Sequence, residues 1–307
     1  MNGTLIDVAG ATDLHCHPYP DLFPRLADDV DVAQFASERG LRAFVIKCHH
    51  ESSVSRAYHV QKQFPELRVF GGIVLNHAVG GINPAAADAA LKLGAKEVWM
   101  PTVDAAYHAE MHGGTGGYDV QSSGTAAVPK TGISVTDDEG NLRPETLEVL
   151  DLISQYGAIL GTCHISPKEI HALVTEARAR GVEKIVITHP FFKVPNLDVE
   201  DLKTLSSQGA FAEFGYCTVS PMWHYATVTK VADAINTIGA SHALLVSDTG
   251  QRHNPMPADA LRIFAQSVFE SGVSEEDVHT LIAVNPAELL GLPASAPVEG
   301  GVTDARV

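Results

Sequence analysis

Short apolar stretches alternate with amphipathic stretches along most of the chain. Eight stretches are rich in Val, Ile, Leu and Ala, which is typical of buried parallel strands, and helical periodicity follows each of them. The predicted strands are Thr12–His15, Arg42–Lys47, Arg68–Leu75, Lys96–Met100, Ala158–Cys163, Lys184–Thr188, Ala210–Phe214 and Ala243–Ser247. Eight successive β-then-α units predict an α/β fold in which eight parallel strands close into a (β/α)8 TIM barrel.

Residues that favour helix ends support this alternation. Asn83-Pro84 is predicted to open a helix that ends at Gly94, and Ser166-Pro167 is predicted to open one that ends at Gly181. Pro257 is predicted to open a third helix. Helix starts at these points fit the expected position of a helix after each strand.

The interval between the fourth and fifth strands is much longer than the others. Residues 102–142 fill most of it and contain the glycine-rich segment 112–117 and the turn-like segment 137–141. They predict a long inserted loop after strand four, with a hairpin, that serves as a lid. Residues 1–292 are otherwise predicted to form a single domain, and residues 293–307 to form a loosely attached tail.

Charge narrows the classes of partner. The chain has 37 acidic and 21 basic residues, a formal net charge of −16, which disfavours nucleic acid and anionic membrane surfaces as partners. No apolar stretch approaches the roughly 18 residues of a membrane span, and the N-terminus lacks the features of a signal peptide. We therefore expect a cytoplasmic protein with a small-molecule partner, and the oligomeric state, a homo-oligomer included, stays open.

Polar side chains gather at the carboxyl ends of the predicted strands, where a TIM barrel places its active site. His15 and His17 are two residues apart on an extended segment, so both imidazoles point to the same side. His164, His189 and Asp248 follow strands five, six and eight. Because buried ionisable groups are costly unless a cation joins them, the five residues predict a divalent metal site. Zinc is the first choice of metal, with Mn or Fe as alternatives.

These residues resemble the ligand pattern of the amidohydrolase superfamily of metal-dependent barrel enzymes. The resemblance rests on Asp13-x-His15-x-His17 after strand one, His164 after strand five, His189 after strand six and Asp248 after strand eight. The segment Asn285–Leu292 is also similar to the helix that commonly ends these chains. The resemblance covers essentially the whole barrel and implies a metal-dependent hydrolase with one or two divalent metals per chain.

One departure from the family pattern concerns the bridging ligand. Binuclear members often have a carboxylated lysine or a glutamate at the end of strand four, where this chain has Trp99–Thr102, and Glu97 lies at the start of that strand. Lys47, at the end of strand two, is the hypothesised replacement, because a lysine carbamate presents two anionic oxygens. The alternatives are a Lys47 ammonium paired with Asp248 or a substrate anion, and His49 as the ligand from this strand.

The resemblance implies cleavage of an amide, cyclic amide, lactone or related ester bond. A divalent cation lowers the pKa of a bound water to about 7, and Asp248 is the predicted catalytic residue that accepts its proton. A decarboxylase of the same superfamily, a phosphoesterase and a non-catalytic metal-binding protein are the alternatives. The phosphoesterase alternative is weakened because the chain continues Asp248-Thr249-Gly250 where an Asp-x-His is expected.

Substrate recognition is expected from the loops after the strands. The residues available there are His77, His112, Tyr216, Arg252 and His253. Arg252 and His253 could hold a carboxylate or phosphate, although an exposed Arg252 could instead pair with the acidic surface. Glu213, at the end of strand seven, is expected to orient a ligand histidine or to be an additional ligand, and a buried salt bridge is the alternative.

Overall fold

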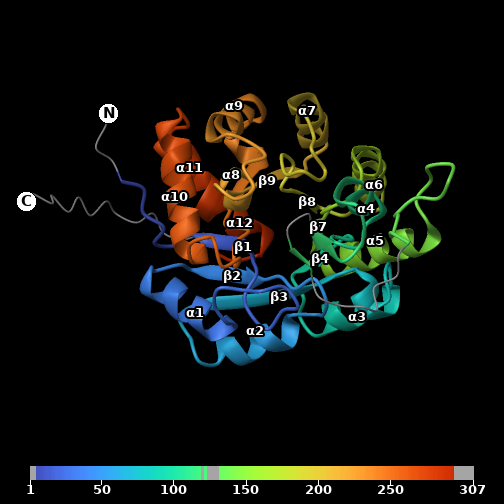
Figure 1. Cartoon of the computed structure of the whole chain (residues 1–307), viewed down its shortest axis with the longest axis horizontal. Helices are drawn as coiled ribbons and strands as arrows, with labels where there is room; N and C mark the ends of the chain where they lie inside the picture. The colour runs from blue at the N-terminus through green and yellow to red at the C-terminus, as the bar shows by residue number, and fades with distance from the viewer. Residues whose placement is uncertain (1–4, 119–120, 123–130, 294–307) are drawn as a thin grey trace, which may run out of the picture.

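The computed structural model describes residues 5–118, 121–122 and 131–293. Its main sheet has eight parallel strands in the order β1-β2-β3-β4-β7-β8-β9-β10 (Figure 1). The bounds are β1 Thr12–Cys16, β2 Ala43–Ile46, β3 Arg68–Val74, β4 Glu97–Trp99, β7 Ile159–Gly161, β8 Lys184–Thr188, β9 Phe211–Gly215 and β10 Ala243–Val246. All eight predicted strands, and the TIM barrel, are confirmed.

The sheet closes on itself between its first and last strands. The amide of Asp248 donates to the carbonyl of His15 at 2.8 Å, and the amide of His17 donates to the carbonyl of Thr249 at 2.8 Å. Both bonds lie at the carboxyl ends of the strands. Barrel closure therefore brings residues from the two ends of the chain together at the mouth of the barrel.

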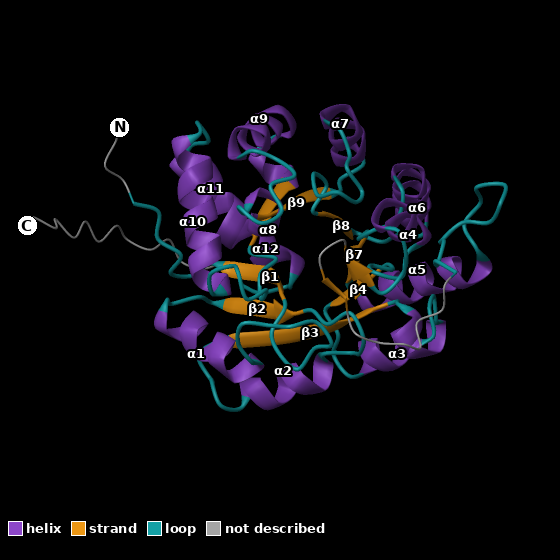
Figure 2. Ribbon diagram, viewed as in Figure 1, coloured by secondary structure: helices purple, strands orange, loops and turns teal. Residues whose placement is uncertain are grey.

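Helices form the outer layer around the strands (Figure 2). The long ones are α1 Asp29–Glu38, α2 Val54–Gln61, α3 Pro84–Lys92, α5 Pro144–Tyr156, α6 Pro167–Ala179, α7 Val199–Ser207, α9 Val228–Ile238 and α10 Pro257–Glu270. Shorter ones are α8 Tyr216–Val219, α11 Glu275–His279, the π-helical turn Thr280–Val284 and α12 Asn285–Leu289. The predicted starts at Pro84, Pro167 and Pro257 are confirmed. The Asn83 and Ser166 side chains cap the first two of these helices, because each accepts a backbone N–H of the first turn.

Two apolar layers, one outside and one inside the sheet, stabilise the barrel. Side chains such as Phe44 and Ile46 pack outward against the helices, and their neighbours Val45 and Trp99 fill the interior. The register of β1 against β2 shifts by one residue between Asp13 and Cys16. A bulge of this kind re-aims side chains, and it allows Leu14 to join the interior layer while His15 lines the mouth.

The long segment after β4 contains regular structure in its described part. It includes α4 Ala106–His112 and the two short strands β5 Gly117–Tyr118 and β6 Gln121–Ser122. The predicted turn is present, since the amide of Asp137 bonds to the carbonyl of Asn141 at 2.8 Å. Residues 119–120 and 123–130 of the predicted loop, and 294–307 of the predicted tail, lie outside the described residues, and a lid function stays a prediction.

A search of the described part of the chain for membrane-spanning helices gives a negative result. None of its helices combines the length and the apolar character that crossing a bilayer requires.

Candidate functional site

The carboxyl ends of the strands surround one cavity with a volume of about 20 Å³. Its lining includes every predicted metal ligand and the predicted alternative ligand. These residues are His15, His17, Lys47, His49, His164, His189 and Asp248. They come from five strand ends that are far apart in the sequence, so barrel closure has assembled the set that the sequence singled out.

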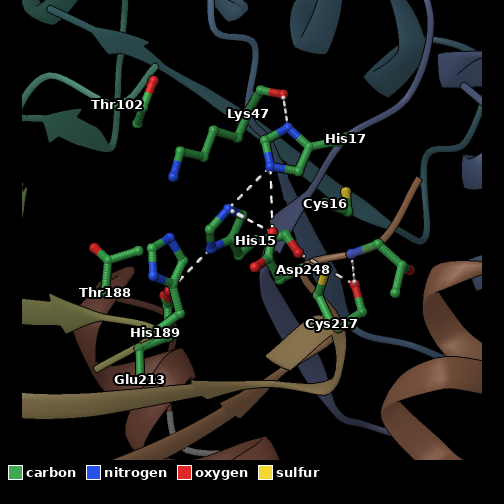
Figure 3. A network of polar contacts seen from close by, with 12 residues as sticks. His15, Cys16, His17, Lys47, Thr102, Thr188, His189, Glu213, Cys217 and Asp248 are labelled. Carbon is green, nitrogen blue, oxygen red and sulfur yellow. Dashed lines mark hydrogen bonds and ion pairs between the residues drawn. The ribbon is translucent and has the colours of Figure 1, made fainter. Parts of the chain in front are cut away.

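The tightest group of donors, which we name the β1–β10 cluster, consists of His15, His17 and Asp248. The Nε2 atoms of His15 and His17 are 3.1 Å apart, and Asp248 Oδ1 lies 3.1 Å from the first and 3.3 Å from the second (Figure 3). All three residues are buried. Three electron-pair donors therefore converge on one point away from bulk water.

The second ring nitrogens of these histidines show where their protons lie. His17 Nδ1 is 3.1 Å from the carbonyl oxygen of Lys47, which can only accept a hydrogen bond. His15 Nδ1 is 2.9 Å from Glu213 Oε1 and donates to this carboxyl group when it is ionised (Figure 3). Each imidazole thus carries its proton on Nδ1 and presents the lone pair of Nε2 to the cluster, which is the form that binds a metal.

A second group, which we name the β7–β8 pair, consists of His164 and His189, with Nε2 atoms 3.2 Å apart. His108 of α4 orients it: His108 Nε2 donates to the carbonyl of Gly117 at 2.7 Å, so His108 Nδ1 is left as an acceptor. That atom lies 2.8 Å from His164 Nδ1. His164 therefore donates through Nδ1 and keeps a lone pair on Nε2 toward His189.

Burial keeps these imidazoles neutral. It lowers the pKa of His15 to about 3, although the charge of Asp248 acts in the opposite direction. Burial likewise holds the pKa values of His17, His164 and His189 well below the ordinary value of histidine. Protonation at neutral pH therefore does not relieve the close approach of lone pairs in the β1–β10 cluster.

The donor geometry fits a divalent cation. Tetrahedral zinc, with bonds of about 2.0–2.1 Å, keeps its ligand atoms about 3.3 Å apart. The separations within both groups, 3.1 to 3.3 Å, match this value. Neutral imidazoles together with a carboxylate, with the protons of His15, His17 and His164 on Nδ1, form a donor set for zinc, manganese or iron.

The backbone at two of the donors is strained. His189 and Asp248 have positive φ values of 31° and 48°, and Cys163, beside His164, has 54°. Non-glycine residues avoid this region, and such strain persists where the surrounding structure enforces it. Gly215 leaves the space that Asp248 needs, since an added Cβ would lie 3.0 Å from the Cβ of Asp248. The chain thus bends sharply as it leaves β8 and β10 and turns both side chains into the cavity.

Lys47 and Glu97 are the interior charges below the donors. Lys47 extends toward the imidazoles (Figure 3), with Nζ 3.5 Å from Cys163 Sγ and 5.3 Å from the centre of the Trp99 ring. In the described part of the chain no carboxylate lies within ion-pair distance of it. Glu97, which the sequence placed at the far end of its strand, is fully buried, and burial and Glu213 raise its pKa well above the ordinary value.

His49 and Glu213 support the donors from the side. The His49 ring stacks on His17 with centroids 4.8 Å apart, and its Nδ1 lies 2.8 Å from Thr102 Oγ1. Glu213 is fully buried against His15, and burial raises its pKa to about 7, although Lys47 opposes the shift. These contacts place His49 beside the β1–β10 cluster and Glu213 behind it, at the position expected of an orienting carboxylate.

The five residues expected to bind substrate lie away from the cavity lining. His77 bonds to the carbonyl of Thr131, and Tyr216 packs on Phe264. Arg252 and His253 are exposed, and Arg252 donates to the carbonyl of Arg25. His112 stacks on His108, with ring centroids 4.3 Å apart. Of the five, His112 comes nearest to the candidate metal ligands, because it stacks on His108, whose ring stacks on His164.

Sequence reasoning missed residues that the structure places in the cavity lining or, like His108, against one of its donors. His108 had a signal, because it lies four residues before His112 and therefore on the same helix face. Arg25 and the four aromatic residues of the lining had none. The aromatic residues are Phe23, Tyr118, Phe192 and Trp223. They come from loops and from β5, where no periodic pattern predicts what a side chain faces.

Comparison with known proteins places the sequence in a family. Residues 10–213 match a family described as "Family of unknown function (DUF6282)". The chain belongs to this family. A search of curated proteins finds no match.

Solved structures share the fold of this DUF6282 protein. An amidohydrolase from Pseudomonas aeruginosa is 11% identical, with a TM-score of 0.60 over 92% of this chain and 95% of that one. The probable dipeptidase PvdM from the same organism is 11% identical, with a TM-score of 0.62 over 92% and 94%. A phosphotriesterase homology protein from Escherichia coli, with phosphate in its active site, is 15% identical, with a TM-score of 0.54 over 93% and 100%. The predicted resemblance to amidohydrolase-superfamily barrels is confirmed for the fold.

Proposed function

We propose that this DUF6282 protein is a metal-dependent hydrolase that cleaves an amide, cyclic amide, lactone or related ester bond of a small molecule. One observation carries the proposal: the Nε2 atoms of His15 and His17 and Oδ1 of Asp248 lie within 3.3 Å of one another. Their protons are directed elsewhere, so this arrangement is favourable only around a cation. The fold shared with an amidohydrolase and a probable dipeptidase supports the bond class.

The β1–β10 cluster would hold one divalent ion, with zinc as first choice and manganese or iron as alternatives. The β7–β8 pair would supply ligands for the same ion or for a second. A bound divalent cation lowers the pKa of water to about 7 and so provides hydroxide at neutral pH. The orientation of the imidazoles by Glu213, the Lys47 carbonyl and His108 keeps their lone pairs available without protonation steps.

Asp248 is the proposed proton carrier. Its Oδ1 faces both imidazoles of the cluster, and burial raises its pKa above the ordinary value, although His15 and Lys47 lower it. A carboxylate of raised basicity, 6% exposed at the cavity wall, is suited to accept a proton from the attacking water. The same carboxyl would then return the proton to the leaving group.

Lys47 is proposed to bridge as a carbamate. The side chain is 1% exposed, and its nearest described polar neighbour is the Cys163 thiol at 3.5 Å. An unpaired buried ammonium is costly. The ammonium first releases a proton, and the neutral amine then attacks carbon dioxide, forming an N–C bond and releasing a second proton, so a carbamate anion replaces the positive charge. Incorporation of 13C from labelled bicarbonate, detected by NMR and lost in Lys47→Arg, tests the modification, and an unlabelled wild-type protein would contradict it.

A substrate panel tests the reaction class. Protein stripped of metal and then reloaded with zinc, manganese or iron is offered amides, cyclic amides, lactones, phosphoesters and carboxylic acids. We expect hydrolysis of one of the first three classes, which requires metal and is lost in Asp248→Asn. Release of carbon dioxide would instead support the decarboxylase alternative, and phosphate release the phosphoesterase alternative. Turnover that survives complete metal removal would contradict the proposal.

A further inference from the structure

We propose that a second cavity, between α4 and the start of α6, binds a small zwitterion, a molecule with one ammonium and one carboxylate group such as an amino acid. We name it the α4–α6 cavity; its lining comes from α4, residues 134–140 and the start of α6. Its volume is about 260 Å³, against about 20 Å³ for the cavity at the strand ends. None of the candidate metal ligands lines it, so the binding site is independent of the proposed function.

Hydrogen bonds hold the walls of the α4–α6 cavity in place without a ligand. The amide of Ala106 donates to the carbonyl of Ile133 at 2.8 Å, which joins α4 to the loop before the turn. Glu169 joins the same loop to α6, because its Oε1 accepts from Ser134 Oγ at 2.6 Å and from the amide of Val135 at 3.0 Å. The cavity is therefore preformed, which lowers the ordering cost of binding.

Two carboxylates of the lining are used within the fold. The second oxygen of Glu169, Oε2, accepts the amide of Ser166 at 2.9 Å and so caps α6. Asp137 Oδ1 accepts the amides of Glu139 and Asn141 at 3.0 and 2.9 Å and so closes the turn. These two groups shape the cavity, and their hydrogen bonds leave them less available to a ligand.

Three other charged side chains line the cavity without such a use. Glu110 comes from α4, Asp138 from the turn and Lys168 from α6. None of the three makes a hydrogen bond or an ion pair within the described part of the chain. Lys168 Nζ lies beside the turn, since a Cβ added at Gly140 would be 3.3 Å from it. Charges of opposite sign thus line one space without pairing.

A zwitterion complements this arrangement. Its ammonium would lie between Glu110 and Asp138, and its carboxylate would contact Lys168. The half-buried ring of Tyr107 provides apolar surface in the same lining for a ligand side chain. Because the three charged residues are exposed, each contact is expected to change affinity by only several-fold.

The two elements that form the cavity also lead to the β7–β8 pair. Tyr107 and Glu110 line the cavity, and His108, on the same helix, orients His164. Ser166, two residues after His164 in the chain, lies in the wall formed by α6. A ligand held between α4 and α6 therefore acts on both sides of His164. Its binding and metal binding at the β7–β8 pair should alter each other by the same factor.

Calorimetric titration with three matched probes tests the site. Leucine carries both charges, leucinamide only the ammonium, and 2-hydroxy-4-methylpentanoate only the carboxylate. The titrations are made at about pH 6.5, where the amino groups are protonated. We expect metal-free wild-type protein to bind leucine at least ~5-fold more tightly than either analogue. The use of metal-free protein excludes chelation of zinc by the amino acid.

Variants assign each charge of the ligand to its wall. Glu110→Gln combined with Asp138→Asn should remove the preference over 2-hydroxy-4-methylpentanoate and keep that over leucinamide. Lys168→Gln should have the opposite effect. Glu148→Gln, at an exposed glutamate of α5 outside the cavity, is the matched control and should keep both preferences. All substituted side chains are exposed, and circular dichroism verifies folding.

The link to the metal site is tested by repeating the leucine titration with protein loaded with zinc and freed of excess metal. The affinity for leucine should differ at least ~5-fold between zinc-loaded and metal-free wild-type protein. In His108→Ala this difference should disappear, because the contact between α4 and His164 is lost.

Equal affinity of wild-type protein for the three probes, or preferences that the cavity variants retain, would overturn the binding site. Equal affinity for leucine with and without zinc would overturn its link to the β7–β8 pair. The proposed function fails separately, through turnover that needs no metal.

Discussion

The two groups of donors in the cavity are held by different parts of the molecule. Hydrogen bonds from the barrel itself orient the β1–β10 cluster: His17 is held by the carbonyl of Lys47 and His15 by Glu213. The β7–β8 pair depends on the inserted segment, because His164 is oriented by His108 of α4, and His108 by the carbonyl of Gly117. Only the first group contains a carboxylate, Asp248.

We infer from this difference that the two groups of donors have different roles. A cluster built into strand ends is as rigid as the barrel, and it contains the one carboxylate suited to move a proton. A pair oriented from an insertion is adjustable, because changes in α4 alter its hydrogen bond without changing the barrel. We therefore expect the chemistry to depend on the β1–β10 cluster, and the second set of ligands to depend on α4.

The largest effect is expected from Asp248→Asn. Removal of the proton carrier should lower kcat on the substrate identified by the panel by about 10²–10⁴-fold. Circular dichroism should stay unchanged, because the amide fills the same volume. A variant that keeps near wild-type kcat would show that Asp248 is not the proton carrier and would break the contrast between the two groups.

Loss of one candidate ligand should reduce metal affinity by different amounts in the two groups. His17→Ala is expected to weaken the tightest zinc ion more than ~100-fold, since losing a ligand costs more than losing its hydrogen-bond partner. His164→Ala should leave that ion bound and remove only a second ion, or leave the stoichiometry unchanged if one ion is present. Elemental analysis with chelator competition measures both. Equal losses in the two variants would mean that the groups form one site.

His108→Ala tests the role of the inserted segment. Loss of the hydrogen bond to His164 should weaken metal binding at the β7–β8 pair by about 10–100-fold without affecting the β1–β10 cluster. The absorption spectrum of cobalt-substituted protein reports the altered geometry directly. His112→Leu is the control, because it removes another imidazole of α4, one that stacks on His108. If the His108→Ala protein kept the wild-type cobalt spectrum and metal affinity, α4 would have no role in the metal site.

Metal removal should have the smallest effect, a small loss of fold stability. The structural change should be confined to part of the molecule. At free zinc about tenfold above its dissociation constant, binding stabilises the fold by about 1.4 kcal/mol, a shift of a few degrees in Tm. Hydrogen exchange after chelation should rise more in α4 than in β1, because α4 is linked to the β7–β8 pair through His108, whereas β1 is held by hydrogen bonds within the barrel. A uniform rise in both would contradict the difference in rigidity.

The strands and the donors of the cavity were predictable from the sequence for a common reason. Buried parallel strands are continuous apolar stretches, and the polar residue that ends such a stretch must lie at the barrel mouth. This reasoning located His15, His17, His164, His189 and Asp248, all of which line one cavity. It also located Glu213, which bonds to His15. This reasoning depends only on the apolar pattern and on the position of each polar residue along the chain.

The same reasoning did not identify the rest of the cavity lining. Arg252 and His253 follow Asp248 closely in sequence but are exposed, whereas Arg25 lines the cavity. The decisive contact is that of Arg25 with Asp21, and a pair in an irregular loop has no periodicity that shows which way it faces. Glu97 is a similar case, since its place at the start of a strand gave no indication of its buried neighbours Lys47 and Glu213.

The sequence alone determined the barrel and the candidate donors at its mouth, because a continuous apolar stretch and the polar residue that ends it are local properties. Tertiary structure decided how those side chains are used. The direction of each imidazole proton follows from Glu213, the Lys47 carbonyl and His108, which are brought close by closure of the barrel and by the fold of the insertion. Such contacts join residues distant in the chain, and no local pattern encodes them.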